Sequence, residues 1–214
     1  MSDNNKNKKV LLISRKDAFN IENIIEFVSR NFDATILVEK REINFPSEIN
    51  SWSGDYIFSY LCPWILPTNL IQNVGQAAIN FHPGPPSYPG TGCYNFAIYQ
   101  EEKEYGVTCH HLARKVDTGK VICVKNFPLH SSDRISDLIK RTYVYLNFIF
   151  FEITSGLLSN ETLPESDLKW GRKPYTKKDL NELCKLSKKM SDEEINKRVR
   201  ATTFPGKPGS YFID

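Results

Sequence analysis

The segment Ala77-Ala78-Ile79-Asn80-Phe81-His82-Pro83-Gly84 joins a short apolar run to two polar side chains and a proline-rich turn. Comparable apolar runs precede it at 9–14, 34–38 and 56–60, and an amphipathic helical pattern lies at 21–32. Strands that alternate with helices in this way are typical of a parallel sheet with helices packed on its faces. We therefore predict an α/β fold: a Rossmann-like, mostly parallel sheet with helices on both faces.

The remaining elements follow from the same periodicities. Asn20 is expected to cap the first helix, and residues 39–55 are expected to form a loop. We expect further helices at 66–74, 93–103 and 135–157, and further strands at 105–112 and 120–127. Residues 1–8 are expected to be a disordered lead-in, 9–158 the main domain and 159–214 a small C-terminal extension. Ser191 begins a capping box for a helix within that extension.

Charge and cysteine content argue against several classes of protein. The net charge of +3 is too small to predict nucleic-acid binding, and the lysines of 169–189 alternate with acidic residues, as on a solvated helix face. The five cysteines show no C-x-x-C pair, so we predict free thiols rather than a zinc site or a disulfide framework. The N-terminus is polar, and the longest apolar stretch, 142–153, is too short to cross a bilayer. We predict a cytoplasmic protein that binds neither nucleic acid nor membrane.

Asn80, His82 and Asp117 carry groups suited to acyl transfer. Side chains alternate along a strand, so Asn80 and His82 project from the same face and can meet one ligand atom. A carboxamide N–H can donate to a developing oxyanion, and an imidazole can exchange a proton there. Asp117, on the turn before Thr118-Gly119, could hold the tautomer of that imidazole. From residue types alone, a structural histidine beside proline and an aspartate that only forms its turn stay open as alternatives.

Longer stretches resemble one enzyme family. They are Ala78-Ile79-Asn80-Phe81-His82-Pro83 and the segment 105–122, and Leu66-Pro67 fits the family's Ile-Leu-Pro element upstream. In these stretches the chain resembles the formyltransferases that use N10-formyltetrahydrofolate, and the resemblance is strongest over 56–128. The resemblance implies catalytic roles for Asn80, His82 and Asp117, and a supporting, substrate-side role for His110. It also implies N10-formyltetrahydrofolate as co-substrate and no metal.

The resemblance also implies a mechanism of direct transfer. The neutral amine of the acceptor attacks the formyl carbon, while Asn80 and protonated His82 stabilise the oxyanion. His82 and Asp117 then move the proton that releases tetrahydrofolate. Packing at the sheet surface is the alternative role for His110.

The acceptor is inferred from differences among the subtypes of that family. The purine-pathway enzyme, glycinamide ribonucleotide formyltransferase, holds a phosphate on a Gly-Ser-Asn loop, whereas residues 14–20 here contain no glycine. The initiator-tRNA enzyme has an additional β-barrel domain, for which this sequence leaves no room. The loop at 83–94 and the segment 200–206 instead resemble those of nucleotide-linked sugar N-formyltransferases. We therefore predict formylation of a nucleotide-diphosphate-linked amino sugar, dTDP-linked by preference, for lipopolysaccharide (O-antigen) synthesis.

The same resemblance suggests where the two small molecules bind. The folate is expected to lie against Leu61, Trp64, Ile65 and Leu66. Aromatic and basic side chains are expected to meet the nucleotide sugar, namely Tyr88, Tyr94, Arg200, Phe204, Lys207 and Tyr211. Each of these could equally serve packing. A homodimer, built from material within 120–200, is a further expectation from the family.

Four alternatives stay open at this point. The same three residues could hydrolyse formyltetrahydrofolate, or could serve glycinamide ribonucleotide as acceptor. A folate- or nucleotide-binding module that has lost catalysis is a third, and intact Asn80, His82 and Asp117 count against it. The fourth is a metal site of those residues with His110, since imidazole and carboxylate suit divalent metals.

Overall fold

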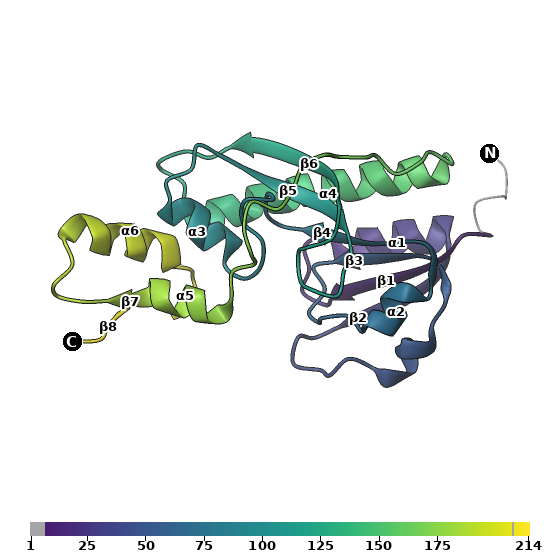
Figure 1. The fold of residues 1–214 in the computed structure, drawn as a ribbon, viewed down its shortest axis with the longest axis horizontal. Helices are drawn as coiled ribbons and strands as arrows, with labels where there is room; N and C mark the ends of the chain where they lie inside the picture. Colours follow the sequence, from purple (N-terminus) through teal and green to yellow (C-terminus); the bar gives the residue numbers. More distant parts are fainter. Residues whose placement is uncertain (1–6, 207) are drawn as a thin grey trace.

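The computed structural model describes residues 7–206 and 208–214. A six-stranded sheet with the order β2-β1-β3-β4-β5-β6 forms its centre (Figure 1). The pairs β1–β2, β1–β3 and β3–β4 are parallel, and β4–β5 and β5–β6 are antiparallel, so the predicted mostly parallel sheet is confirmed. The strands are β1 (Lys9–Arg15), β2 (Asp33–Glu39), β3 (Gly54–Tyr60), β4 (Val74–His82), β5 (Glu104–His111) and β6 (Val121–Pro128).

Helices cover both faces of the sheet, as predicted (Figure 1). On one face, α1 (Ile21–Asn31) and α4 (Ile135–Leu158) pack against the aromatic residues of β3 and β4. On the other face, α2 (Thr68–Gln72) contributes Leu70 to a second, smaller core. Alternate residues of each strand serve the two faces, which explains why these strands are continuously apolar in sequence.

The strand order opens a crevice at one edge of the sheet. From strand β1, the second in this order, the chain passes to β2 on one side and then returns to β3 on the other. The segments that leave the carboxyl ends of β1 and β3 therefore diverge, and ligands of α/β sheets bind in such a crevice. Arg15 ends β1, Tyr60 ends β3 and His82 ends β4. The polar end of segment 77–84 thus lies beside the crevice.

The helices and strands of the C-terminal extension lie at the end of the molecule that holds α3 (Cys93–Tyr99), and the segment after α4 runs to them from the opposite end (Figure 1). Its helix α6 packs against α3, where Nδ2 of Asn95 donates to the carbonyl oxygen of Ala201 at 2.7 Å. A parallel bridge also joins Gly90 to Tyr175, which ties the extension to the proline-rich loop after β4. The elements of the extension are α5 (Lys177–Cys184), β7 (Lys185–Leu186), α6 (Asp192–Thr202) and β8 (Tyr211–Phe212).

Some element boundaries differ from the sequence-based predictions. The helix expected at 66–74 is shorter, because Pro67 precedes α2 and β4 already begins at Val74. Helix α3 ends at Tyr99 rather than at 103, and Glu101 then takes a left-handed φ of 56°. Residues 39–55 include a short 3-10 helix, Ser47–Ser51. The helix α5 lies within 169–189, where the alternating charges are those of a solvated helix face, and Thr176 and Asp179 form a full capping box before it.

The expected helix caps are only partly realised. Asn20 precedes α1, but its φ is 59° and its side chain makes no capping hydrogen bond. Its carboxamide instead donates to Asn147, at 2.5 Å. Ser191 accepts the backbone N–H of Glu194 as predicted, but the carboxylate of Glu194 binds Tyr99 and Arg198 rather than the backbone of Ser191. The side chains of Asn20 and Glu194 thus bond residues outside the capping motif, among them the distant Asn147 and Tyr99.

The described chain begins at Asn7. The ammonium of Lys8 donates to the carbonyl oxygen of Leu157 and, at 2.9 Å, to Oδ1 of Asn160, so this residue of the expected lead-in is held in place. Residues 1–6 lie outside the described residues. Within the part of the chain that is described, no helix has both the length and the apolar character that a membrane span requires.

Candidate active site

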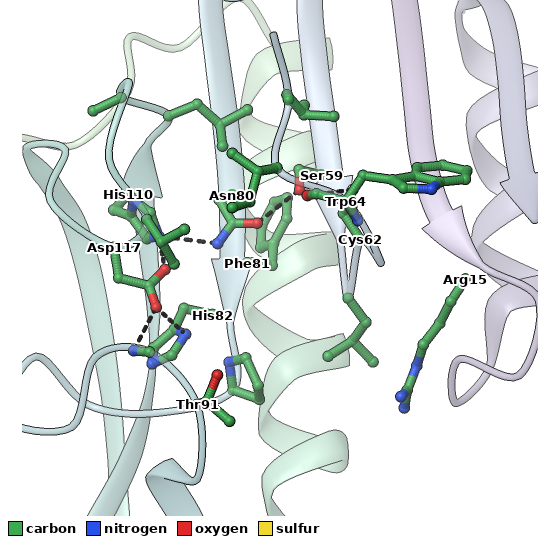
Figure 2. A pocket seen from close by; sticks show the side chains of 18 of the residues that line it. Arg15, Ser59, Cys62, Trp64, Asn80, Phe81, His82, Thr91, His110 and Asp117 are labelled. Atoms are coloured by element: carbon green, nitrogen blue, oxygen red, sulfur yellow. Dashed lines mark hydrogen bonds and ion pairs between the residues drawn. The ribbon is translucent and has the colours of Figure 1, made fainter. Parts of the chain in front are cut away.

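Asn80 and His82 lie at the end of strand β4 and line one cavity (Figure 2). The carboxamide of Asn80 is held from both sides. Its Oδ1 accepts from the hydroxyl of Ser59 at 2.7 Å, and its Nδ2 lies 3.0 Å from Nε2 of His110. These two bonds fix the carboxamide and leave one of its N–H groups for a ligand.

Asp117 lies between the two histidines. Its Oδ2 is 3.2 Å from Nδ1 of His82, and its Oδ1 is 3.3 Å from Nε2 of His110. The backbone N–H of Gly90 donates to the same Oδ2 at 2.7 Å. Asp117 itself has a left-handed φ of 47°, a conformation that aspartate adopts more readily than most residues. Its side chain therefore serves the site across the sheet rather than only its own turn.

Both ring nitrogens of His82 face hydrogen-bond acceptors. Nδ1 faces Asp117, and Nε2 lies 3.1 Å from the carbonyl oxygen of Tyr88, so only the protonated ring can donate to both. Burial lowers the pKa of His82, whereas the Asp117 carboxylate and the Tyr88 carbonyl oppose that shift. A ring that gives up its proton readily, yet has two acceptors in place when protonated, suits proton transfer.

The charge of Asp117 is secured by its neighbours. Burial by itself raises the pKa of this carboxyl group, but His82, His110 and the N–H of Gly90 outweigh it and hold the pKa well below its usual range. Asp117 is therefore a carboxylate at any pH at which the protein would work. It can orient His82 and stabilise the positive charge that this ring acquires on protonation.

Two glycines and one tryptophan complete the surroundings of Asn80, His82 and Asp117, which we call the triad. A Cβ at Gly84 would stand 2.7 Å from Nε2 of His82, and one at Gly119 would stand 1.8 Å from the carbonyl oxygen of His111. Both positions thus require glycine. Trp170, from the C-terminal extension, donates its indole N–H to the carbonyl oxygen of Gly119 at 2.8 Å. The extension therefore reaches the turn that carries Asp117.

A cavity of about 390 Å³ opens in front of these groups, within the size range of small-molecule sites. Figure 2 shows Arg15 on the opposite side of this cavity from Asp117. Nη2 of Arg15 donates to the hydroxyl of Tyr143 at 2.8 Å, and both residues line the cavity. The four residues expected to meet the folate also line it, namely Leu61, Trp64, Ile65 and Leu66.

The residues expected to bind the nucleotide sugar divide into two groups. Tyr94 and His110 line the cavity. Tyr88 does not: it is 2% exposed, and its hydroxyl donates to Gln100 and Glu102. The proline-rich loop turns this ring inward, where it stacks on Tyr175 and does not line the cavity.

The four remaining predicted sugar-binding residues belong to the extension, and the three that the structure describes, Arg200, Phe204 and Tyr211, do not line the cavity. The guanidinium of Arg200 donates to the carbonyl oxygen of Asp133 at 3.2 and 3.3 Å. Phe204 packs against the core around α3, and Tyr211 is half-exposed in β8. Lys207 lies outside the described residues. The side chains of Arg200 and Phe204 meet protein groups and that of Tyr211 is exposed, so binding roles for these residues stay predictions.

Several residues of the site were not predicted. Ser59 could have been found, because it pairs in register with Asn80 on the neighbouring parallel strand. Arg15 could have been found as the last residue of β1. Tyr143 and Trp170 carry no local signal, because α4 and the extension reach the site from distant parts of the chain. Among the described residues, no group of three His, Cys, Asp or Glu side chains is placed to hold a metal ion.

The sequence pattern of one family, described as formyl transferase, matches residues 2–146. This chain belongs to the formyl transferase family. A related member, the methionyl-tRNA formyltransferase of Lactobacillus johnsonii, is 23% identical over 172 residues, covering 78% of this chain and 52% of that protein. This formyl transferase family member thus spans about half the length of that relative.

Two solved formyltransferase structures share the fold. The 4-N formyltransferase from Francisella tularensis superposes with a TM-score of 0.79 at 20% identity, over 98% of this chain and 93% of that one. The N-formyltransferase from Helicobacter canadensis, solved with folinic acid and dTDP-3-aminofucose, superposes with a TM-score of 0.69 at 20% identity, over 91% of this chain and 80% of that one. At this level of identity the likeness shows the fold of the family member and leaves its substrates open.

Proposed function

We propose that this protein transfers a formyl group from N10-formyltetrahydrofolate to the amine of a nucleotide-diphosphate-linked amino sugar, with a dTDP-linked sugar favoured. The observation that carries the proposal is the hydrogen-bonded cluster of Asn80, His82 and Asp117 at the wall of one cavity. Membership of the formyl transferase family supports the reaction class. The ligands of the Helicobacter canadensis structure support this pair of substrates. A role in lipopolysaccharide synthesis stays a prediction.

The three residues take distinct roles in this proposal. The free N–H of Asn80 donates to the formyl oxygen as negative charge develops there. His82 accepts a proton from the attacking amine and passes it on towards the leaving nitrogen. Asp117 holds the ring through Nδ1 and stabilises its charged form.

The residues present fit a formyl-folate. Leu61, Leu66 and Ile65 give an apolar wall beside the triad, suited to a flat heterocycle. The indole N–H of Trp64 donates to the carbonyl oxygen of Ile43 at 2.7 Å, which fixes the ring at the edge of that wall. When bound, the folate supplies the activated formyl group.

The charges of the cavity support an anionic acceptor. Arg15, Arg41 and Lys115 line it, whereas Asp117 is the one carboxylate among its described lining residues. The phenol oxygen of Tyr94 is buried at the wall, and among the described residues it has no hydrogen-bond partner. Cations and spare donors of this kind favour a ligand that carries phosphate.

A panel of acceptors tests the proposal. The protein is incubated with N10-formyltetrahydrofolate and a set of dTDP- and UDP-linked amino sugars, and products are followed by mass spectrometry. We expect at least one dTDP-linked amino sugar to gain the mass of one formyl group. Turnover on glycinamide ribonucleotide alone, or formate release without any formylated product, would overturn the proposal.

A further inference from the structure

Ser59 is a buried serine that contacts Asn80 and takes no part in the proposed transfer itself. It is 2% exposed and lies on β3, in register with Asn80 on the neighbouring strand β4. Its hydroxyl is 2.7 Å from Oδ1 of Asn80 (Figure 2). A hydroxyl can donate or accept, so the direction of this bond depends on how the carboxamide is turned.

The orientation of that carboxamide follows from its other neighbour. Nδ1 of His110 lies 2.8 Å from the carbonyl oxygen of His111, and a carbonyl only accepts, so Nδ1 carries the hydrogen. In the neutral ring Nε2 is then an acceptor, and the group of Asn80 that faces it must be the NH2. Oδ1 of Asn80 consequently faces Ser59, and the hydroxyl of Ser59 must be the donor.

We infer that Ser59 is a positioning residue for the oxyanion donor: its hydroxyl holds Oδ1 of Asn80 so that the second N–H points into the cavity. The catalytic meaning of this inference rests on the proposed formyl transfer. Without the hydroxyl, the carboxamide can turn over and present its carbonyl oxygen where a donor is required. The developing negative charge would then meet an acceptor, which destabilises it.

The neighbourhood of His110 makes Ser59 the more important of the two partners of Asn80. Nε2 of His110 also lies 3.3 Å from Oδ1 of Asp117. Nε2 of His110 is therefore shared between Asn80 and a carboxylate, whereas the hydroxyl of Ser59 lies 2.7 Å from the carboxamide oxygen of Asn80. The bond from Ser59 is thus the more specific hold on the carboxamide.

Ser14 provides a matched control. It is also fully buried, and it lies near the carboxyl end of β1, the strand beside β3. Its hydroxyl, however, reaches only the carbonyl oxygen of Arg15, at 3.4 Å, and it contacts none of the triad. The substitutions Ser59→Ala and Ser14→Ala thus remove the same atom from buried positions on neighbouring strands, and only the first should affect Asn80.

Steady-state kinetics with the acceptor that is formylated test the inference. We expect Ser59→Ala to lower kcat about tenfold with both KM values within about twofold of wild type, whereas Ser14→Ala is unchanged and Ser59→Thr restores most of the rate. In an Asn80→Ala background, Ser59→Ala should cause no further loss, because its target is gone. An unchanged kcat in Ser59→Ala, or a full further loss in that background, would overturn the inference.

A second readout needs no acceptor. In a ¹H–¹⁵N spectrum, the side-chain amide signals of Asn80 are assigned by their loss in Asn80→Ala. We expect Ser59→Ala to shift those signals and Ser14→Ala to leave them in place. If no acceptor is formylated but the signals shift, the proposed function fails and the positioning by Ser59 stands. If the signals do not move, the positioning by Ser59 is refuted.

Discussion

The indole of Trp170 meets the imidazole of His110 edge-on, with ring centroids 4.9 Å apart and ring planes at 89°. The same indole lies 5.8 Å from the ring of His82. Trp170 belongs to the C-terminal extension, whereas both histidines belong to the sheet. The extension therefore helps to exclude water from the two imidazoles, which strengthens their interactions with Asp117.

Truncating this indole should harm catalysis more than binding. We expect Trp170→Ala to lower kcat about tenfold and Trp170→Phe to lower it less, because a phenyl ring still covers the histidines. Trp52→Ala is the control, since Trp52 bonds Thr35 and packs on a different part of the sheet. Formyl transfer is assayed at a temperature at which all variants are folded. Equal losses in Trp170→Ala and Trp52→Ala would show that the indole has no particular role at the triad.

His82 leaves no room for a side chain at position 84. In Gly84→Ala the new methyl group would stand 2.7 Å from Nε2 of His82, so the ring must move. Because a displacement of about 1 Å can cost about a hundredfold in rate, we expect a loss of that order in kcat. Gly75→Ala, on strand β4, adds a methyl group whose nearest neighbour, the carbonyl oxygen of Gly54, is at an ordinary 3.6 Å, and should be close to wild type. Retained turnover in Gly84→Ala would contradict the assigned role of His82.

The buried ring of His82 should make stability depend on pH. Its pKa is lowered by burial, so between the ordinary value of 6.5 and the folded value the unfolded chain binds more protons than the native one. The free energy of unfolding should therefore fall as the pH drops below 6.5, by up to about 1.4 kcal/mol per pH unit from this group. Asp117, whose pKa is also lowered, adds stability above its ordinary value of 3.8 that is lost in stronger acid.

Urea unfolding from pH 7.5 to 5.5 isolates the histidine contribution. In this window Asp117 is ionised in both states, and the lowered pKa of His111 affects wild type and variant alike. We expect the pH slope to be smaller in His82→Gln than in wild type. An equal or steeper slope in the variant would mean that Asp117 and Tyr88 raise the pKa of His82 at least as much as burial lowers it.

The cluster of Asn80, His82 and Asp117 could be predicted from sequence because short-range patterns specify it. Asn80 and His82 share a strand face by simple alternation, and Asp117 precedes a Thr-Gly turn. The parallel sheet could be predicted for the same reason, from apolar runs separated by helical patterns. Both inferences depend on spacing within one or two elements.

The remaining site residues depend on contacts between distant segments. Trp170 arrives from about fifty residues beyond the turn that it touches, and Tyr143 arrives from the middle of α4. Tyr88 is the opposite case, a residue near the site in sequence that does not line the cavity. It stands in the proline-rich loop, but its ring points inward, where Gln100 and Glu102 accept from its hydroxyl. Sequence gives the residue type at such positions, whereas packing determines which way the side chain faces.

The most direct measurement follows the formyl group itself. N10-formyltetrahydrofolate labelled with ¹³C in the formyl carbon is mixed with the dTDP-linked amino sugars, and the label is traced by NMR. We expect the label to appear in the sugar amide with wild-type protein, and Asn80→Ala and His82→Ala, both folded, to transfer it about a hundredfold to a thousandfold more slowly. Label that reaches only formate, or transfer that persists unchanged in either variant, would contradict a formyl transfer carried out by these residues.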